Sequence, residues 1–281
     1  MVDLIANNMD NIYRGICSKV LEKGESIPVL EKGFEKTCTK ELNNFSFELT
    51  NLDNNIINIR NISKSYLCAE LTWYMLGRND LEFIQPFANL WGRLSDDGKT
   101  CYSAYGDIVF KRHGFDQIDK IIELLAKDPS SRRAVVNFNV PNQNVIETKD
   151  EVCTIALQFY IRDNKLYCTG IMRSNDIWTG LPYDTVFFTE LQKYIAHRLN
   201  VEYGTYTHFA ISLHVYDRNF EDIKKVVDVI QTEKLSFDIE ALDRYKRLIE
   251  KAVTEETDKV EKRRIIIETC EALNILTVKE I

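Results

Sequence analysis

The spacing of apolar residues changes in the middle of this 281-residue chain, and that change limits the folds it can adopt. In residues 116–127 apolar side chains recur every three or four positions, which predicts an amphipathic helix that Pro129 ends. Apolar and polar residues alternate instead in three later segments, 133–140, 153–163 and 165–174. This alternation predicts three strands, and Asp163–Asn164 predicts a tight turn that joins the last two as a hairpin.

The other segments add helices on both sides of these strands. Helices are predicted at 8–23 and from Ser65 to about Gly77, and a mostly apolar, hence buried, helix is predicted at 183–200. Further strands are predicted at 36–51, 55–62 and 203–219, followed by helical structure from Phe220 to the end. Helices packed on one sheet make an α+β (mixed α/β) fold. We expect one domain over 1–281, with a helical C-terminal appendage at about 235–281 as the alternative.

Composition excludes several classes of protein. The formal net charge is −7 and the basic residues are scattered, so a basic face for duplex nucleic acid is not expected. No apolar run approaches the ~20 residues that a membrane span needs, and the first residues carry acids instead of the basic region of a signal peptide. We therefore expect a cytoplasmic protein that binds neither nucleic acid nor membranes.

The cysteines and histidines form no metal-ligand pattern. Seven cysteines are widely spaced, four histidines lie at unrelated positions, and no Cys-x-x-Cys pair occurs. This spacing argues against structural zinc, and the odd number of cysteines argues against a disulfide framework. We expect no bound metal.

Cys153 begins a predicted strand, and Arg173 lies near the end of the next one. A nucleophilic cysteine needs a nearby cation to hold its thiolate, and the predicted hairpin would bring Arg173 beside Cys153. The alternative is that Cys153 is a small buried apolar residue, which is the commoner role for a cysteine at the edge of a strand.

Several polar residues stand at positions with two interpretations. Arg132 and Arg133 follow a helix, where they suit a phosphate or, equally, a helix C-terminus with surface ion pairs. Glu70 lies in an apolar helical segment, either reaching solvent or buried for catalysis. His214 and Tyr216 share one face of a strand, as site residues or as core residues with satisfied polar tips.

In their order, these segments resemble the thymidylate synthase family from about Glu35 to Asn219. The matching blocks are EKTCT, AELTWYMLG, YSAYGD, DPSSRRAVV, the strand of Cys153, RSNDIWTGLPYD and HVY. Three features depart from synthases: Val152-Cys153-Thr154 replaces Pro-Cys-His, Asp184 replaces an asparagine, and no recognisable C-terminal segment closes over folate. With these departures the chain resembles the viral deoxycytidylate (dCMP or CMP) hydroxymethylase branch more closely.

Asp184 stands at the head of the apolar helix, either as its N-cap or as a group that reads the base. An asparagine amide suits uracil because it donates to O4 and accepts from N3–H. Cytosine reverses both positions, so a carboxyl group accepts from N4–H and shares a proton with N3. Opposite uracil, an ionised Asp184 would leave buried polar atoms unmatched, at about 1–3 kcal/mol or more. We interpret Asp184 as the residue that selects cytosine.

The resemblance implies a homodimeric one-carbon transferase with 5,10-methylenetetrahydrofolate as co-substrate. Cys153 would add to C6 of the pyrimidine, C5 would attack the methylene group, and water would add after tetrahydrofolate leaves. Glu70 would be the general acid/base that places this water, and Tyr105 would join the same network. Arg173 would lower the pKa of Cys153 and contact the phosphate.

The resemblance also implies a set of binding residues. Substrate contacts fall to Lys36, Arg132, Arg133, Arg173, Ser174, Asp184, His214 and Tyr216, and folate contacts fall to Trp91, Asp176, Gly180 and Tyr183. Lys36 replaces a loop arginine, so its contact with the phosphate would be monodentate. Arg132 and Arg133 would reach the phosphate site of the partner subunit.

Two other functions stay open. One is methyl transfer, by a thymidylate synthase or a dCMP methyltransferase, in which the folate itself delivers a hydride. The other is a non-catalytic nucleotide-binding homodimer, against which the joint presence of Cys153, Arg173 and Glu70 argues. Arg133 and Ser174 keep the pattern of the deoxynucleotide branch, which favours dCMP over CMP.

Overall fold

The computed structural model describes residues 2–30, 36–139, 148–231 and 233–280. Its main sheet has the order β1-β3-β8-β6-β5-β4, with β2 paired to β3 and β7 paired to β8. The strands of this sheet are β1 (Leu4–Ala6), β2 (Glu25–Leu30), β3 (Lys36–Leu49), β4 (Ala134–Asn137), β5 (Thr154–Arg162), β6 (Lys165–Met172), β7 (Asn175–Asp176) and β8 (Glu202–Tyr216). The sheet is mixed, because β1 runs parallel to β3, and β6 and β7 run parallel to β8.

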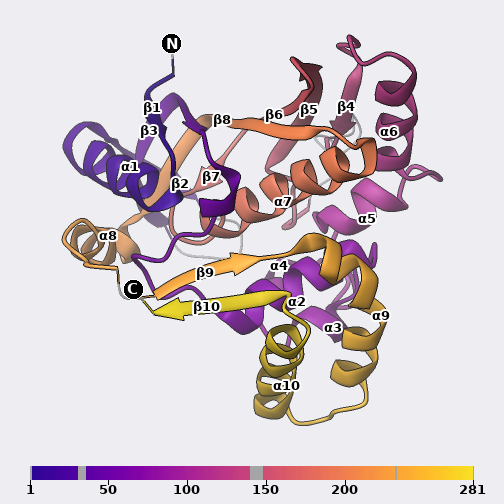
Figure 1. Ribbon diagram of the computed structural model, residues 1–281. Helices are drawn as coiled ribbons and strands as arrows, with labels where there is room; N and C mark the ends of the chain where they lie inside the picture. Colours follow the sequence, from indigo (N-terminus) through magenta and orange to yellow (C-terminus); the bar gives the residue numbers. More distant parts are fainter. Residues whose placement is uncertain (1, 31–35, 140–147, 232, 281) are drawn as a thin grey trace.

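The helices lie mostly to one side of this sheet (Figure 1). They are α1 (Met9–Lys23), α2 (Lys64–Met75), α3 (Leu81–Ile84), α4 (Leu90–Leu94), α5 (Tyr105–Phe110), α6 (Gln117–Lys127), α7 (Leu181–Leu199), α8 (Phe220–Val226), α9 (Ile239–Thr254) and α10 (Lys259–Ala272). In Figure 1, α7 runs beneath β8 and β6, between the sheet and the C-terminal elements. This arrangement confirms the expected α+β class. Among the described residues no helix combines the length and the apolar character that crossing a bilayer demands.

The hairpin predicted at Asp163–Asn164 joins β5 to β6. Both residues have positive φ, 50° and 58°, as a two-residue type I′ turn requires, and Asp and Asn tolerate this conformation well. The turn sets the register, which pairs Arg162 with Lys165 and, at the far end, Thr154 with Met172. The residues just outside these ends, Cys153 and Arg173, are thereby placed side by side.

The strand predicted at residues 55–62 does not form. Ile56 and Ile57 are both buried although they are adjacent, which a strand with one open face would not allow. The backbone is held instead by the carboxylate of Asp10 in α1, which accepts hydrogen bonds from the N–H groups of Asn58 (2.6 Å) and Ile59 (3.1 Å). This segment is therefore a buried loop, and the alternation in its sequence was misleading.

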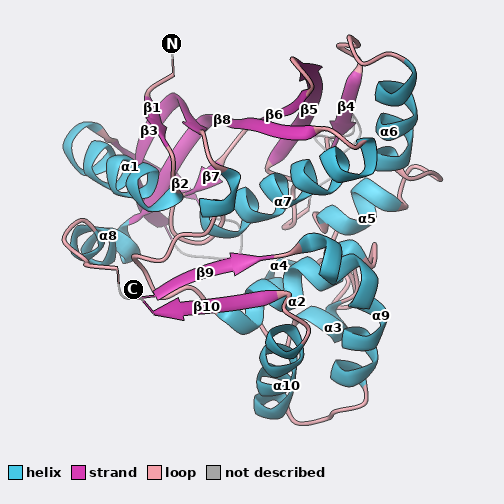
Figure 2. Ribbon diagram, viewed as in Figure 1, coloured by secondary structure: helices cyan, strands magenta, loops and turns pink. Residues whose placement is uncertain are grey.

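The prediction of helix from Phe220 to the end is only partly right. The helices α8, α9 and α10 form, but β9 (Glu233–Phe237) and β10 (Leu276–Glu280) pair as a separate antiparallel two-stranded sheet (Figure 2). Leu235 and Phe237 are buried and alternate with polar residues, which is a strand pattern. The charged residues around these short strands obscured that pattern.

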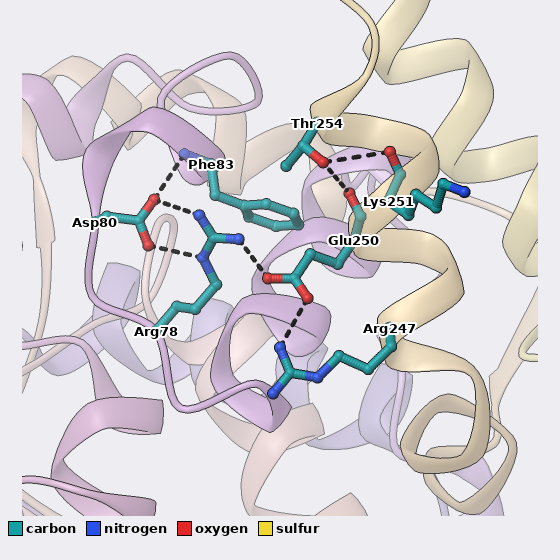
Figure 3. Close-up of polar contacts among 7 residues, drawn as sticks. All are labelled: Arg78, Asp80, Phe83, Arg247, Glu250, Lys251 and Thr254. Carbon is teal, nitrogen blue, oxygen red and sulfur yellow. Dashed lines mark hydrogen bonds and ion pairs between the residues drawn. The ribbon is translucent and has the colours of Figure 1, made fainter.

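An ion-pair network ties the C-terminal helices to the end of α2 (Figure 3). Arg78 donates from Nε and Nη2 to the two carboxylate oxygens of Asp80, at 2.7 and 2.8 Å, and from Nη1 to Glu250 of α9, at 2.6 Å. The other oxygen of Glu250 accepts from Arg247 at 2.8 Å. Because Arg78 follows directly on α2 and its terminal Gly77, the network joins α9 to the helix that carries Glu70.

Candidate active site

Cys153 and Arg173 meet across the β5–β6 hairpin, as the sequence predicted. The N–H of Arg173 donates to the carbonyl of Cys153 at 2.9 Å, and Nη2 lies 3.7 Å from the Cys153 Sγ. The guanidinium also donates to the carbonyls of Val152 (2.9 Å) and Glu151 (3.0 Å), which fixes it against the cysteine segment. The β5–β6 register shifts between Thr154 and Ala156, and such bulges commonly re-aim side chains beside active sites.

The environment of the Cys153 thiol contains opposing influences. Burial raises its pKa to about 11, the Arg173 guanidinium acts to lower it, and the Asp184 carboxylate raises it further. The expected effect of Arg173 is therefore present but is smaller than the effect of burial. At neutral pH the free protein holds Cys153 mainly as the thiol, so its attack on a substrate requires that a proton leaves.

Asp184 does not cap the helix. The N-cap position of α7 is Gly180, and Asp184 lies one turn further along, its N–H donating to the carbonyl of Gly180 at 3.0 Å. Its carboxylate is held on both oxygens instead: the Tyr105 hydroxyl donates to Oδ1 at 3.1 Å and the Asn175 amide donates to Oδ2 at 2.8 Å. The structure therefore excludes the interpretation of Asp184 as the N-cap of this helix.

Burial also perturbs the Asp184 carboxyl group. It raises the pKa to about 7, while the hydrogen bonds from Tyr105 and Asn175 act in the opposite direction. A carboxyl group offers about four acceptor positions, of which the described residues occupy one on each oxygen. The described residues thus leave one position free on each oxygen, and the group can hold a proton at neutral pH.

A chain of hydroxyl groups connects Asp184 with the cysteine segment. Thr154, directly after Cys153, donates to the Tyr105 hydroxyl at 2.8 Å, and Tyr105 in turn donates to Asp184. Tyr105 therefore joins the network of Asp184, and the described hydrogen bonds do not extend it to Glu70. Sequence reasoning did not assign a role to Asn175, although it lies inside the RSND block between Ser174 and Asp176.

Glu70 is buried in α2, with 5% of its surface exposed. Two phenols donate to the same carboxylate oxygen, Oε1: Tyr66 through a short hydrogen bond and Tyr74 at 3.2 Å. Burial raises the pKa of Glu70 to about 8, the Tyr66 and Tyr74 hydrogen bonds oppose the increase, and the Asp184 carboxylate adds to it. Tyr66 and Tyr74 were missed in the sequence, although each lies four residues from Glu70 and hence on the same helix face.

The residues assigned to folate are distributed around Glu70 and Asp184. Trp91 donates its indole N–H to the Tyr66 hydroxyl at 3.0 Å, and the Tyr183 ring packs edge-on against Tyr66 with centroids 4.7 Å apart. Asp176 accepts from the Trp178 N–H at 2.8 Å. At Gly180 a Cβ would lie 3.0 Å from the Asp184 Oδ2, so a side chain there would crowd the carboxylate.

Three of the residues assigned to the substrate, His214, Tyr216 and Ser174, lie on β8 or just before β7. His214 pairs with Asp176 across β7 and β8, and its carbonyl accepts from the Ile177 N–H at 2.7 Å. The His214 ring packs edge-on against Tyr216 with centroids 5.3 Å apart. Ser174 is partly buried between β6 and β7. These contacts bring His214, Tyr216 and Asp176 to the same end of the sheet.

The residues assigned to the phosphate are not all brought together. Arg132 and Arg133 are exposed just before β4, whose first residue, Ala134, pairs with Phe159. Phe159 is five residues along β5 from Thr154, which is about 17 Å at the usual rise of a strand. Within one chain these arginines therefore lie far from Cys153. Lys36 begins β3, but its side chain lies outside the described residues.

Comparison with known proteins identifies the family. A family model described as thymidylate synthase matches residues 11–268. The chain belongs to the thymidylate synthase family. This is a family of one-carbon transferases, which agrees with a cysteine beside an arginine and with two carboxyl groups whose pKa values are raised by burial.

Individual relatives are 30–33% identical to this chain over the parts that align. A Methanocaldococcus jannaschii protein, named provisionally as a thymidylate synthase, is 33% identical over 76% of this chain and 90% of its own length. A deoxyuridylate hydroxymethyltransferase of Bacillus phage SP01 is 30% identical over 78% of this chain and 61% of its own length. A protein of the same name from Pseudomonas phage M6 is 31% identical over 60% of this chain and 49% of its own.

A solved structure bears out the fold. Thymidylate synthase A from Bacillus subtilis superposes with a TM-score of 0.69, covering 81% of this chain and 87% of the synthase at 23% identity. In the described part of the chain, no three His, Cys, Asp or Glu side chains are grouped as a metal site would need.

Proposed function

We propose that this protein is a cytidylate C5-hydroxymethyltransferase that converts dCMP, in preference to CMP, with 5,10-methylenetetrahydrofolate and water. The observation that carries the proposal is the Asp184 carboxyl group, held by Tyr105 on one oxygen and by Asn175 on the other. Each oxygen keeps an acceptor position, which matches the two-atom N4/N3 edge of cytosine. Pairing with N3 also needs a proton, and a pKa of about 7 makes that proton available near neutral pH.

The Cys153 thiolate is the proposed nucleophile. The thiol first loses its proton to solvent, the thiolate then adds to C6 of the base, and the electron pair of the C5–C6 double bond moves to C5, which becomes nucleophilic. Arg173, with Nη2 3.7 Å from the sulfur, stabilises the thiolate that this step requires. The carbonyls of Val152 and Glu151 hold the guanidinium in place, so that it can serve the sulfur and a substrate phosphate from one position.

Glu70 is the proposed acid/base for the water that completes a hydroxymethyl group. A pKa of about 8 suits this role because the group can both take and return a proton near neutral pH. The two phage relatives named as hydroxymethyltransferases support hydroxymethyl transfer over methyl transfer. Their names specify deoxyuridylate, so the preference for cytosine rests on Asp184 alone.

The proposed folate position is bounded by aromatic rings and one carboxylate. Trp91 and Tyr183 both contact Tyr66, and together these rings form a surface on which a flat heterocycle can pack. Asp176 accepts hydrogen bonds from the Trp178 N–H and the Thr179 hydroxyl, and its remaining acceptor positions suit the N–H groups of a pterin. These residues fit 5,10-methylenetetrahydrofolate as the one-carbon donor.

A homodimer packed through the sheets is part of the proposal. The sheet face opposite α7 carries partly exposed apolar side chains, among them the stacked rings of Tyr160 and Tyr167 and the 43%-exposed Ile211. Partner contact would cover this face, and it would let Arg132 and Arg133, which lie about 17 Å along the sheet from the Cys153 segment of their own chain, act at the phosphate site of the partner subunit.

The test is turnover of dCMP, CMP and dUMP, each labelled with tritium at C5, with methylenetetrahydrofolate. We expect the fastest tritium release with dCMP. We also expect a 5-hydroxymethyl product by mass spectrometry and no rise in near-ultraviolet absorbance from dihydrofolate. A methylated product with dihydrofolate would instead establish the synthase or dCMP methyltransferase reaction, which the family match supports. Tritium release from none of the three would favour a non-catalytic nucleotide-binding dimer.

A further inference from the structure

Both hydrogen bonds to the Glu70 side chain end on one oxygen. Tyr66 and Tyr74 lie one helical turn before and after Glu70 in α2, and each donates to Oε1. Among the described residues, no hydrogen bond is formed to Oε2. The two carboxylate oxygens thus have different surroundings: one is fixed by the helix itself and the other is left for a ligand or a water molecule.

We propose that Tyr66 and Tyr74 are positioning residues, which fix the Glu70 carboxylate by Oε1 so that Oε2 handles the water added to the substrate. This inference rests on the proposed role of Glu70 as the acid/base. It adds two residues that the family resemblance did not supply.

Trp91 determines the direction of the Tyr66 hydroxyl group. An indole N–H can only donate, so the hydrogen bond from Trp91 Nε1 occupies an acceptor position on the Tyr66 oxygen, at 3.0 Å. The single phenolic proton of Tyr66 is then directed to Glu70. The Tyr66 ring is also held edge-on by Tyr183. Tyr66 therefore connects the proposed folate surface, formed by Trp91 and Tyr183, to the proposed acid/base.

The two phenols also determine when Glu70 can act as a base. A buried carboxylate is disfavoured by desolvation, and hydrogen bonds that donate to it favour the ionised form. Removal of either hydroxyl takes away one such bond while the burial remains, so the pKa of Glu70 rises. If Glu70 must be ionised to take a proton from water, the acid limb of the pH–activity profile then moves to higher pH.

The experiment compares pH profiles of kcat and kcat/KM for hydroxymethyl formation in the full-length protein and in Tyr66→Phe, Tyr74→Phe and the double variant. We expect the acid limb to move to higher pH by about one unit in each single variant, the size of a hydrogen bond to a charged group. The matched control is Tyr203→Phe, which loses a phenol–carboxylate hydrogen bond to Asp53, 2.8 Å long, near the start of β8. Its profile should stay at the wild-type position.

A second measurement is independent of turnover. Infrared titration follows the protonated carboxyl band of Glu70, assigned as the band that Glu70→Gln removes, in the wild-type protein and in both Phe variants. A Glu70 titration that moves to higher pH in Tyr66→Phe supports the proposal even if the substrate assignment is wrong. An unchanged Glu70 titration together with an unchanged acid limb, in variants that melt like the wild type, would overturn it.

Discussion

Replacement of Asp184 by asparagine is the most direct perturbation of base recognition. The structure indicates how the variant would be accommodated. Asn175 now donates to Oδ2, and its own Oδ1 is buried with no partner among the described residues. Rotation of the Asn175 amide would let that oxygen accept from the new amide N–H, while Tyr105 continues to donate to the other position. The variant would then present one donor and one acceptor to the base, as uracil requires.

The expected change in base preference follows from the two hydrogen-bonding positions that change in Asp184→Asn. Each mismatched buried polar pair costs about 1–3 kcal/mol, so two pairs amount to about 2–6 kcal/mol of discrimination. At 1.36 kcal/mol per factor of ten, the ratio of kcat/KM for dCMP over dUMP should fall by between ~30-fold and ~10⁴-fold in Asp184→Asn.

Tritium release from 5-labelled dCMP and dUMP at pH 7 gives both kcat/KM values. Asp53→Asn is a matched control, because it makes the same chemical change at an exposed carboxylate, which among the described residues accepts a side-chain hydrogen bond from Tyr203 alone. If folded Asp184→Asn protein kept a dCMP to dUMP ratio within about threefold of wild type, the carboxyl group would not be reading the base, since even one mismatched pair at ~1 kcal/mol predicts more.

Three further outcomes are expected. Mixing inactive Cys153→Ser and Arg133→Ala subunits should restore about a quarter of wild-type activity, because half of randomly formed dimers then hold one complete site; no recovery would place Arg133 outside the partner's site. Arg78→Met should lower the free energy of unfolding by about 2 kcal/mol in urea titrations, since it removes the ion pair of Asp80 and one ion pair of Glu250, which keeps its pair with Arg247. Arg247→Met, at a 73%-exposed side chain, should change it by less than about 1 kcal/mol. The pKa of Asp184 is raised from 3.8 to about 7 on folding, so its ionisation lowers the free energy of unfolding as pH rises through that window. Asp184→Asn should reduce this fall in stability between pH 4 and 7 by at most about 4 kcal/mol. An unchanged pH dependence of stability would contradict the shift.

The sequence was most informative where local geometry leaves few choices. The Asp163–Asn164 turn could be recognised because a two-residue loop needs positive φ at both positions, and once it forms the register places Arg173 beside Cys153. The helix α7 could be recognised from its composition, because a long helical segment that is mostly apolar must be buried on most sides.

The sequence was least informative where tertiary contacts determine the backbone. The strand predicted at 55–62 was wrong because Asp10, which lies 48 residues before Asn58, supplies the acceptors that a neighbouring strand would otherwise provide. The contacts of Asn175 with Asp184 and of Trp91 with Tyr66 likewise join separate segments. Spacing along the chain could have revealed Tyr66 and Tyr74, which lie four residues on either side of Glu70 in one helix.

The two buried carboxyl groups also act on each other, and this links base choice to catalysis. The charge on Asp184 contributes to the raised pKa of Glu70. A cytosine whose N3 accepts a hydrogen bond from the protonated carboxyl group of Asp184 keeps that group neutral. This removes the contribution of Asp184 and favours the ionised, basic form of Glu70. An ionised Asp184 opposite uracil would do the reverse and hold Glu70 protonated. Asp184→Asn should therefore move the acid limb of kcat/KM to lower pH, opposite to the shift expected for Tyr66→Phe, and a shift in the same direction for both variants would show that the two carboxyl groups are not coupled in this way.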